Sequence, residues 1–158
     1  MTGPVFNESI LREIDSVKER YPDQESALLP VLYIAQREFG WLSEEALTTA
    51  AAALNLPEAT VRGTASFYSM FRHKEMGRNL VQLCTNISCM ILGSEKLVDI
   101  LQTKFNLKPG ETTEDGRFSL VIMECIGACG SAPAMLVNTD YYDNLTEESI
   151  MEILEKYK

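Results

Sequence analysis

The residues best suited to carry chemistry are four cysteines arranged in two pairs. Four residues separate Cys84 from Cys89, three separate Cys125 from Cys129, and the chain has no other cysteine. Each pair follows a short apolar run that predicts a β-strand, over residues 80–83 and 118–123. If these strands are neighbours in a sheet, the four sulfurs meet at one place. Such a place is either a metal site or a pair of disulfides.

The spacing of the cysteines favours an iron-sulfur cluster. All-cysteine zinc sites and thioredoxin-type dithiols usually use pairs with about two intervening residues. Four thiolates are the usual ligands of iron-sulfur clusters, and a gap of about four residues also occurs in plant-type ferredoxins. Two ligands from each segment suit a 2Fe-2S cluster in which each pair holds one iron. A zinc ion and a 4Fe-4S cluster remain as alternatives.

Residues beside the cysteines are candidates for stabilising the negative charge of such a cluster. Gly127 and Gly130 flank the second pair, where small residues allow backbone N–H groups to approach sulfur. Thr85 and Ser88 offer hydroxyl groups in the first segment. The alternative for the two glycines is that they only permit turns. Because the nearby Glu124 and the acidic composition oppose reduction, we expect one-electron transfer at low potential.

Composition and charge exclude several kinds of partner. The 158 residues include 14 basic and 23 acidic side chains, a net charge of −9. A surface of this sign repels phosphate backbones, so we expect no nucleic acid partner. No apolar stretch reaches the roughly 20 residues needed to span a bilayer, and residues 1–14 lack the pattern of a secretory signal. We therefore expect a cytoplasmic chain without direct membrane insertion, where paired cysteines are more often ligands than structural disulfides.

Residues 1–75 predict a helical bundle. Helical spacing and capping residues predict helices after Asn7, over 28–39, from Ser43 to residue 54, and from residue 58 towards residue 71. The last two resemble a helix-turn-helix, but Arg62 is the only basic residue before the end of the final helix. That is too little positive charge for DNA recognition, so packing or docking is the better interpretation.

Residues 76–158 predict a second domain with alternating strands and helices. Strands are expected over 80–83, 118–123, 134–137 and 141–142, and helices over 94–105 and after Thr146. The order strand, helix, strand, strand, strand, helix is that of a thioredoxin-like domain with a mixed sheet. The expected fold class is therefore α/β (α+β), with an N-terminal helical bundle followed by a thioredoxin-like domain.

Several stretches distributed over nearly the whole chain carry a family resemblance. They are Gly40-Trp41-Leu42, residues 65–71 (Ala-Ser-Phe-Tyr-Ser-Met-Phe), 84–89, 113–118 (Thr-Glu-Asp-Gly-Arg-Phe), 124–129 and Ala132-Pro133. With them the chain resembles the small iron-sulfur subunit of the NADH-oxidising module of respiratory complex I, NADH:quinone oxidoreductase. The resemblance implies that Cys84, Cys89, Cys125 and Cys129 ligate one 2Fe-2S cluster in a thioredoxin-like ferredoxin domain. Ile126 stands where the family more often has leucine, an exchange with no expected effect.

The resemblance also implies a partner. In the family a larger flavoprotein subunit binds FMN and NADH, and the cluster of the small subunit exchanges single electrons with that FMN. This chain lacks a Gly-rich dinucleotide fingerprint, so we do not expect it to oxidise NADH alone. The expected location is cytoplasmic and peripheral to the inner membrane, within a prokaryotic complex.

The resemblance gives individual residues further expected roles. Pro133 stands where thioredoxin-like folds often hold a cis proline, with an ordinary trans proline as the alternative. Phe67, Tyr68 and Phe71 are expected to dock on the flavoprotein or to pack in the core. His73 is expected at the surface rather than as a ligand.

Other functions remain as alternatives. The same module occurs in NAD-linked soluble hydrogenases and formate dehydrogenases, with a different catalytic partner. From another class, the chain would be a zinc-binding structural adaptor. A free-standing redox ferredoxin is a third alternative, against which the N-terminal helices argue, since a ferredoxin needs no such appendage.

Overall fold

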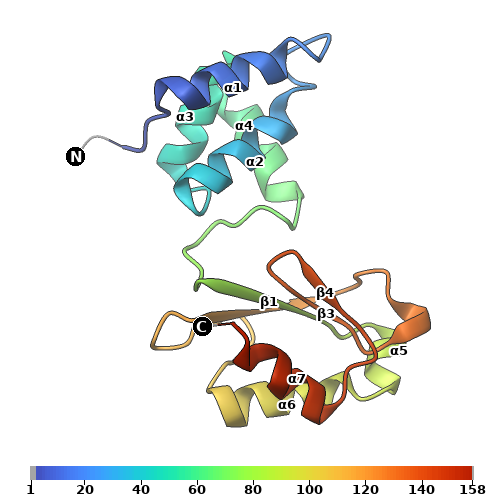
Figure 1. Cartoon of the computed structure of the whole chain (residues 1–158). Helices are drawn as coiled ribbons and strands as arrows, with labels where there is room; N and C mark the ends of the chain where they lie inside the picture. Colours follow the sequence, from blue (N-terminus) through green and yellow to red (C-terminus); the bar gives the residue numbers. More distant parts are fainter. Residues whose placement is uncertain (1–2, 158) are drawn as a thin grey trace. The chain divides into compact units, whose positions relative to one another are not determined.

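The computed structural model describes residues 3–157, which form two compact units (Figure 1). The division falls between Glu75 and Met76. Each unit has its own apolar core and is described by itself. No helix among residues 3–157 has the length and apolar character needed to cross a membrane.

The first unit consists of four helices, as the sequence predicts. They are α1 (Glu8–Lys18), α2 (Leu28–Phe39), α3 (Glu44–Leu54) and α4 (Glu58–Phe67). The predicted caps form: the Asn7 side chain accepts from the Ile10 N–H at 3.0 Å, and Ser43 Oγ accepts from the Ala46 N–H at 3.1 Å. Gly40 ends α2 with a φ of 82°, a value that suits glycine.

The end of α4 differs from the prediction that this helix runs towards Phe71. Tyr68 leaves the helical conformation (φ −95°, ψ 118°), and the next turn is closed by a 3.1 Å hydrogen bond from the Phe71 N–H to the Tyr68 carbonyl. This turn brings Phe71 into the core, where it is 4% exposed and its ring lies 5.2 Å from that of Tyr33. Burial of Phe71 therefore comes from a turn, which helical spacing alone does not distinguish from a further helical turn.

The second unit contains a mixed four-stranded sheet. Its strands are β1 (Asn79–Cys84), β2 (Phe118–Met123), β3 (Met135–Val137) and β4 (Asp140–Tyr142), in the spatial order β2-β1-β3-β4. The pair β1 and β2 is parallel, and the other two pairs are antiparallel. Because β1 and β2 are parallel neighbours, the segments that follow them leave the sheet at the same end. The predicted adjacency of the two cysteine-bearing segments is confirmed.

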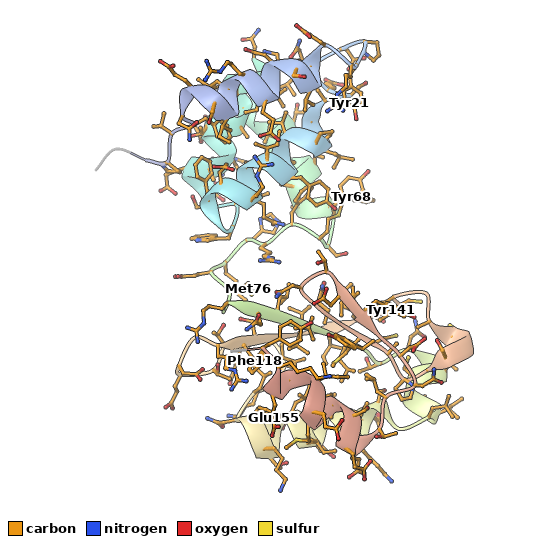
Figure 2. The ribbon with its side chains drawn as sticks, in the orientation of Figure 1. Tyr21, Tyr68, Met76, Phe118, Tyr141 and Glu155 are labelled. Carbon is orange, nitrogen blue, oxygen red and sulfur yellow. The ribbon has the colours of Figure 1, made fainter. Side chains whose placement is uncertain are left out.

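Two helices, α6 (Ser94–Phe105) and α7 (Glu147–Glu155), lie side by side against one face of the sheet (Figure 1). Thr146 caps α7 in a capping box with Ser149. Phe118, at the start of β2, is 1% exposed, and its ring meets that of Phe105 edge-on at 6.1 Å (Figure 2). The core between sheet and helices is formed by apolar side chains from all these elements, among them Val81, Leu83, Leu97, Leu101, Leu120, Met135, Val137, Ile150 and Leu154.

Two short helices were not predicted, and both carry cysteines. Helix α5 (Ile87–Ile91) contains Cys89, and the 3-10 helix η1 (Cys129–Ser131) begins with Cys129. The sequence predicted loops at both places, because elements of three to five residues are too short to show helical periodicity. Asn86 starts α5, since its side chain accepts from the Ile87 N–H at 2.7 Å.

Candidate metal centre

The first cysteine pair joins the end of β1 to α5. Cys84 is the last residue of β1, and its N–H donates to the Ala134 carbonyl at 3.1 Å. Cys89 lies in α5, which Asn86 caps. Both cysteines are buried, with exposed fractions of 3% and 2%. The sheet therefore holds Cys84 in place, and the short helix holds Cys89.

The second pair follows the end of β2. Gly127 lies between Cys125 and Cys129 with a φ of 81°, and its N–H donates to the Cys125 sulfur at 3.3 Å. Cys125 and Cys129 are both exposed. The first segment approaches the second closely, because the Cys84 sulfur lies 3.9 Å from the Glu124 carbonyl oxygen. The Ala132–Pro133 peptide bond that follows is cis.

All four cysteines line one cavity of about 310 Å³. The other residues that line it are Asn86, Ile87, Ser88 and Ala128. All four thiols are free. Within residues 3–157, no three Cys, His, Asp or Glu side chains converge to hold a single metal ion. A two-iron cluster needs only two thiolates at each iron, so its four ligands line a shared cavity rather than surround one point.

The surroundings of Cys89 favour its protonated form until a metal binds. Burial raises the pKa of the Cys89 thiol, and its contacts with Cys84 and the charge of Cys129 raise it further, whereas a backbone hydrogen bond from Ala134 lowers it. A metal that Cys89 ligated would displace this proton, because thiolate is the metal-binding form of cysteine. Such binding would therefore release a proton.

The four predicted neighbours of the cysteines have different surroundings. Gly127 donates its N–H to the Cys125 sulfur, and Ser88 lines the cavity. Thr85 donates its backbone N–H to the Met123 carbonyl at 3.2 Å, a contact between the two cysteine segments. Gly130 lies within η1, where a Cβ atom would meet nothing within 4 Å.

Sequence reasoning missed three residues at this site, Asn86, Ile87 and Ala128. Asn86 shapes the first segment through its cap, and Ala128 is a buried wall of the cavity. An asparagine just before a short apolar run is an N-cap signal, and this signal could have identified Asn86. No comparable signal identifies Ala128, because its burial depends on the packing of both segments.

Four residues of the first unit were predicted to have roles other than cluster ligation, and they lie at the surface or in the core of that unit. His73 is exposed, and its Nε2 lies 3.1 Å from the Ala65 carbonyl oxygen. Phe71 packs in the core, Tyr68 is half-buried (Figure 2), and Phe67 is 80% exposed. Of the three aromatic residues, Phe71 therefore has the predicted packing role and Phe67 is free of the core.

The family model of thioredoxin-like [2Fe-2S] ferredoxins matches residues 14–158. The chain belongs to this family. A thioredoxin-like [2Fe-2S] ferredoxin carries one 2Fe-2S cluster, and the four thiols around one cavity fit this group.

Named relatives of this ferredoxin cover most of the chain. It is 42% identical over 146 residues to a subunit of the NADH-quinone oxidoreductase of Rhizobium meliloti, covering 92% of this chain and 87% of that protein. It is 38% identical over 159 residues to an NADH-quinone oxidoreductase subunit of Rickettsia felis, covering 99% of this chain and 95% of the relative.

The ferredoxin is also similar to part of a solved structure. The air-oxidized form of an NAD+-reducing [NiFe]-hydrogenase matches with a TM-score of 0.69 and 27% identity. The match covers 80% of this chain but only 22% of the hydrogenase chain.

Proposed function

We propose that this chain is the small electron-transfer subunit of an NADH:quinone oxidoreductase. It holds one 2Fe-2S cluster and exchanges single electrons with the FMN of a partner subunit. One observation carries the proposal: cysteines from two separate segments line a single cavity, in a chain of the 2Fe-2S family. The names of its close relatives, which align over most of their length, support the assignment to this complex.

Each cysteine pair holds one iron in this proposal. Cys84 and Cys89, which are buried, would hold one iron, and Cys125 and Cys129, which are exposed, would hold the other. When bound, the cluster supplies reversible one-electron chemistry. The Gly127 N–H, which faces the Cys125 sulfur, stabilises the negative charge that increases on reduction. Thr85 links the two segments through its N–H hydrogen bond to the Met123 carbonyl, and Ser88 contributes to the wall of the cavity.

The partner in this proposal is a larger subunit that binds NADH and FMN. The small subunit is part of the oxidoreductase but does not oxidise NADH alone. Residues 76–158 form the cluster domain, and the helical domain of residues 1–75 contributes to docking within the complex. The complex lies at the cytoplasmic side of a membrane, to which this chain is peripheral.

A second candidate is the equivalent subunit of an NAD-linked hydrogenase or formate dehydrogenase. The similarity to the NAD+-reducing [NiFe]-hydrogenase supports it, although the matched region is a small part of that chain. Chains that co-purify with this subunit separate the two candidates. Membrane subunits of a quinone reductase support the first, and hydrogenase or formate dehydrogenase subunits support the second.

The cluster itself is tested on the purified full-length chain. Under anaerobic conditions we expect a brown protein with about two irons and two acid-labile sulfides per chain. One-electron reduction should produce an electron paramagnetic resonance signal of a spin one-half centre. A colourless protein that holds one zinc ion would instead identify a structural adaptor and refute the proposed function.

A further inference from the structure

An exposed apolar surface lies on α5 and its C-cap residue, Leu92, beside the metal cavity. It consists of Ile87, Met90, Ile91 and Leu92, which are 68%, 46%, 72% and 59% exposed. All four lie within six consecutive positions. Scattered apolar residues are common on protein surfaces, but a cluster of large ones usually marks an interaction site. We call these four residues the α5 surface.

The sequence around the α5 surface carries no charge. Residues 79–94 and 125–139 contain no Asp, Glu, Lys or Arg, although the chain has 37 such residues among 158. These two segments include all four cysteines. Nucleic acid or an anionic membrane would gain no ion pair from either segment. An uncharged, apolar protein surface is the occupant that this composition fits.

The α5 surface is continuous with the cavity. Ile87 is part of the α5 surface and also lines the cavity with the four cysteines. The same helix carries Cys89, which is buried. On the other wall, Cys125 and Cys129 are exposed, so the cavity opens towards solvent. A protein that covers the α5 surface therefore lies at the opening through which a redox partner must approach the cluster.

We propose that the α5 surface is the docking site for the flavin-bearing partner subunit. This inference rests on the proposed function and adds the residues of contact and their chemistry. Burial of Ile87, Met90, Ile91 and Leu92 against an apolar face of the partner stabilises the complex and excludes water from the exposed cysteines. Contact at this place brings the partner's flavin close to the exposed side of the cluster. This contact would allow one electron to pass between flavin and cluster, with no bond formed or broken.

The test uses the full-length, cluster-loaded chain and the FMN-containing subunit of the same complex. Ile91→Lys and Leu92→Lys place a charge on the α5 surface, and Ile91→Leu keeps it apolar. Tyr141→Lys is the matched control, because Tyr141 is 48% exposed but lies on the edge strand β4 (Figure 2). Visible absorption measures cluster content, and titration calorimetry measures the dissociation constant. If Ile91→Lys loses the cluster, Leu92→Gln provides the same test beyond the end of α5.

We expect the two lysine variants to keep the cluster. Their dissociation constants for the flavoprotein should rise about tenfold or more, because substitutions at the centre of an interface typically have effects of this size. Ile91→Leu and Tyr141→Lys should bind like the unsubstituted chain. Equal affinity of both lysine variants and the unsubstituted chain would overturn the docking site. A second result would also overturn the docking site: lysine variants that bind the flavoprotein normally but no longer self-associate. The α5 surface would then bind a second copy of this chain. An unsubstituted, cluster-loaded chain that fails to bind the flavoprotein would overturn the proposed function itself.

Discussion

Substitution of Gly127 by alanine tests how the second cysteine segment controls the cluster. The φ of Gly127 is 81°, and an added Cβ would meet no atom within 4 Å. Space for the methyl group is therefore available. The destabilisation comes from the backbone, because the Cβ of an L-residue in a left-handed conformation lies too close to the following carbonyl oxygen, which costs roughly 1–2 kcal/mol. We expect Gly127→Ala to lower the free energy of unfolding by about this amount, measured by urea denaturation.

The same substitution should lower the reduction potential. A flip of the 126–127 peptide would relieve part of this strain by making the φ of residue 127 negative, and it would turn the residue 127 N–H away from the Cys125 sulfur, which lies 3.3 Å from it in the native chain. A net hydrogen bond contributes about 0.5–1.5 kcal/mol. For one electron a tenfold change in equilibrium equals about 59 mV, so loss of a bond made mainly to the reduced cluster lowers the potential by roughly 20–60 mV. The sign follows because a donor stabilises the more negative, reduced state.

The control for this prediction is Gly130→Ala in the same segment. Gly130 has no left-handed φ, and its Cβ would also meet nothing within 4 Å. Potentials are measured by a redox titration followed by electron paramagnetic resonance. The reasoning is wrong if Gly127→Ala leaves both stability and potential unchanged, or if Gly130→Ala changes them equally.

Three further predictions address the ligands, the core and the first unit. Cys125→Ser replaces a thiolate by a harder oxygen ligand, so iron and sulfide content should fall sharply; unchanged content and spectrum would contradict its assignment as a ligand. Leu101→Ala empties a fully buried position of the second core and should cost about 2–5 kcal/mol in urea denaturation, against about 0.5 kcal/mol or less for the exposed Lys104→Ala on the same helix. Removal of residues 1–72 leaves the second core intact and should preserve the cluster spectrum while weakening flavoprotein binding in a pull-down assay; undiminished binding would show that the first unit is not a docking element.

The sequence alone predicted the features that local chemistry determines. The caps at Asn7, Ser43 and Thr146 form as expected, because each side chain bonds to a backbone N–H only a few residues away. Strand β2 has its predicted bounds, and β1 exceeds its prediction by one residue at each end. The cysteine spacing indicated a 2Fe-2S cluster, and the family match supports the same cofactor. Ligation by the four cysteines stays a prediction.

Only the tertiary structure decided which groups are accessible at the site. Both cysteine pairs follow a predicted strand, yet Cys84 and Cys89 are buried whereas Cys125 and Cys129 are exposed. The α5 helix is too short for a periodic pattern, so the exposure of Ile91 and Leu92 followed only from its placement beside the cavity. Burial depends on contacts between residues far apart in the chain, and these are not encoded in any local pattern. For this protein, spacing therefore determined the chemistry of the sulfurs, and packing decided from which side an electron can reach them.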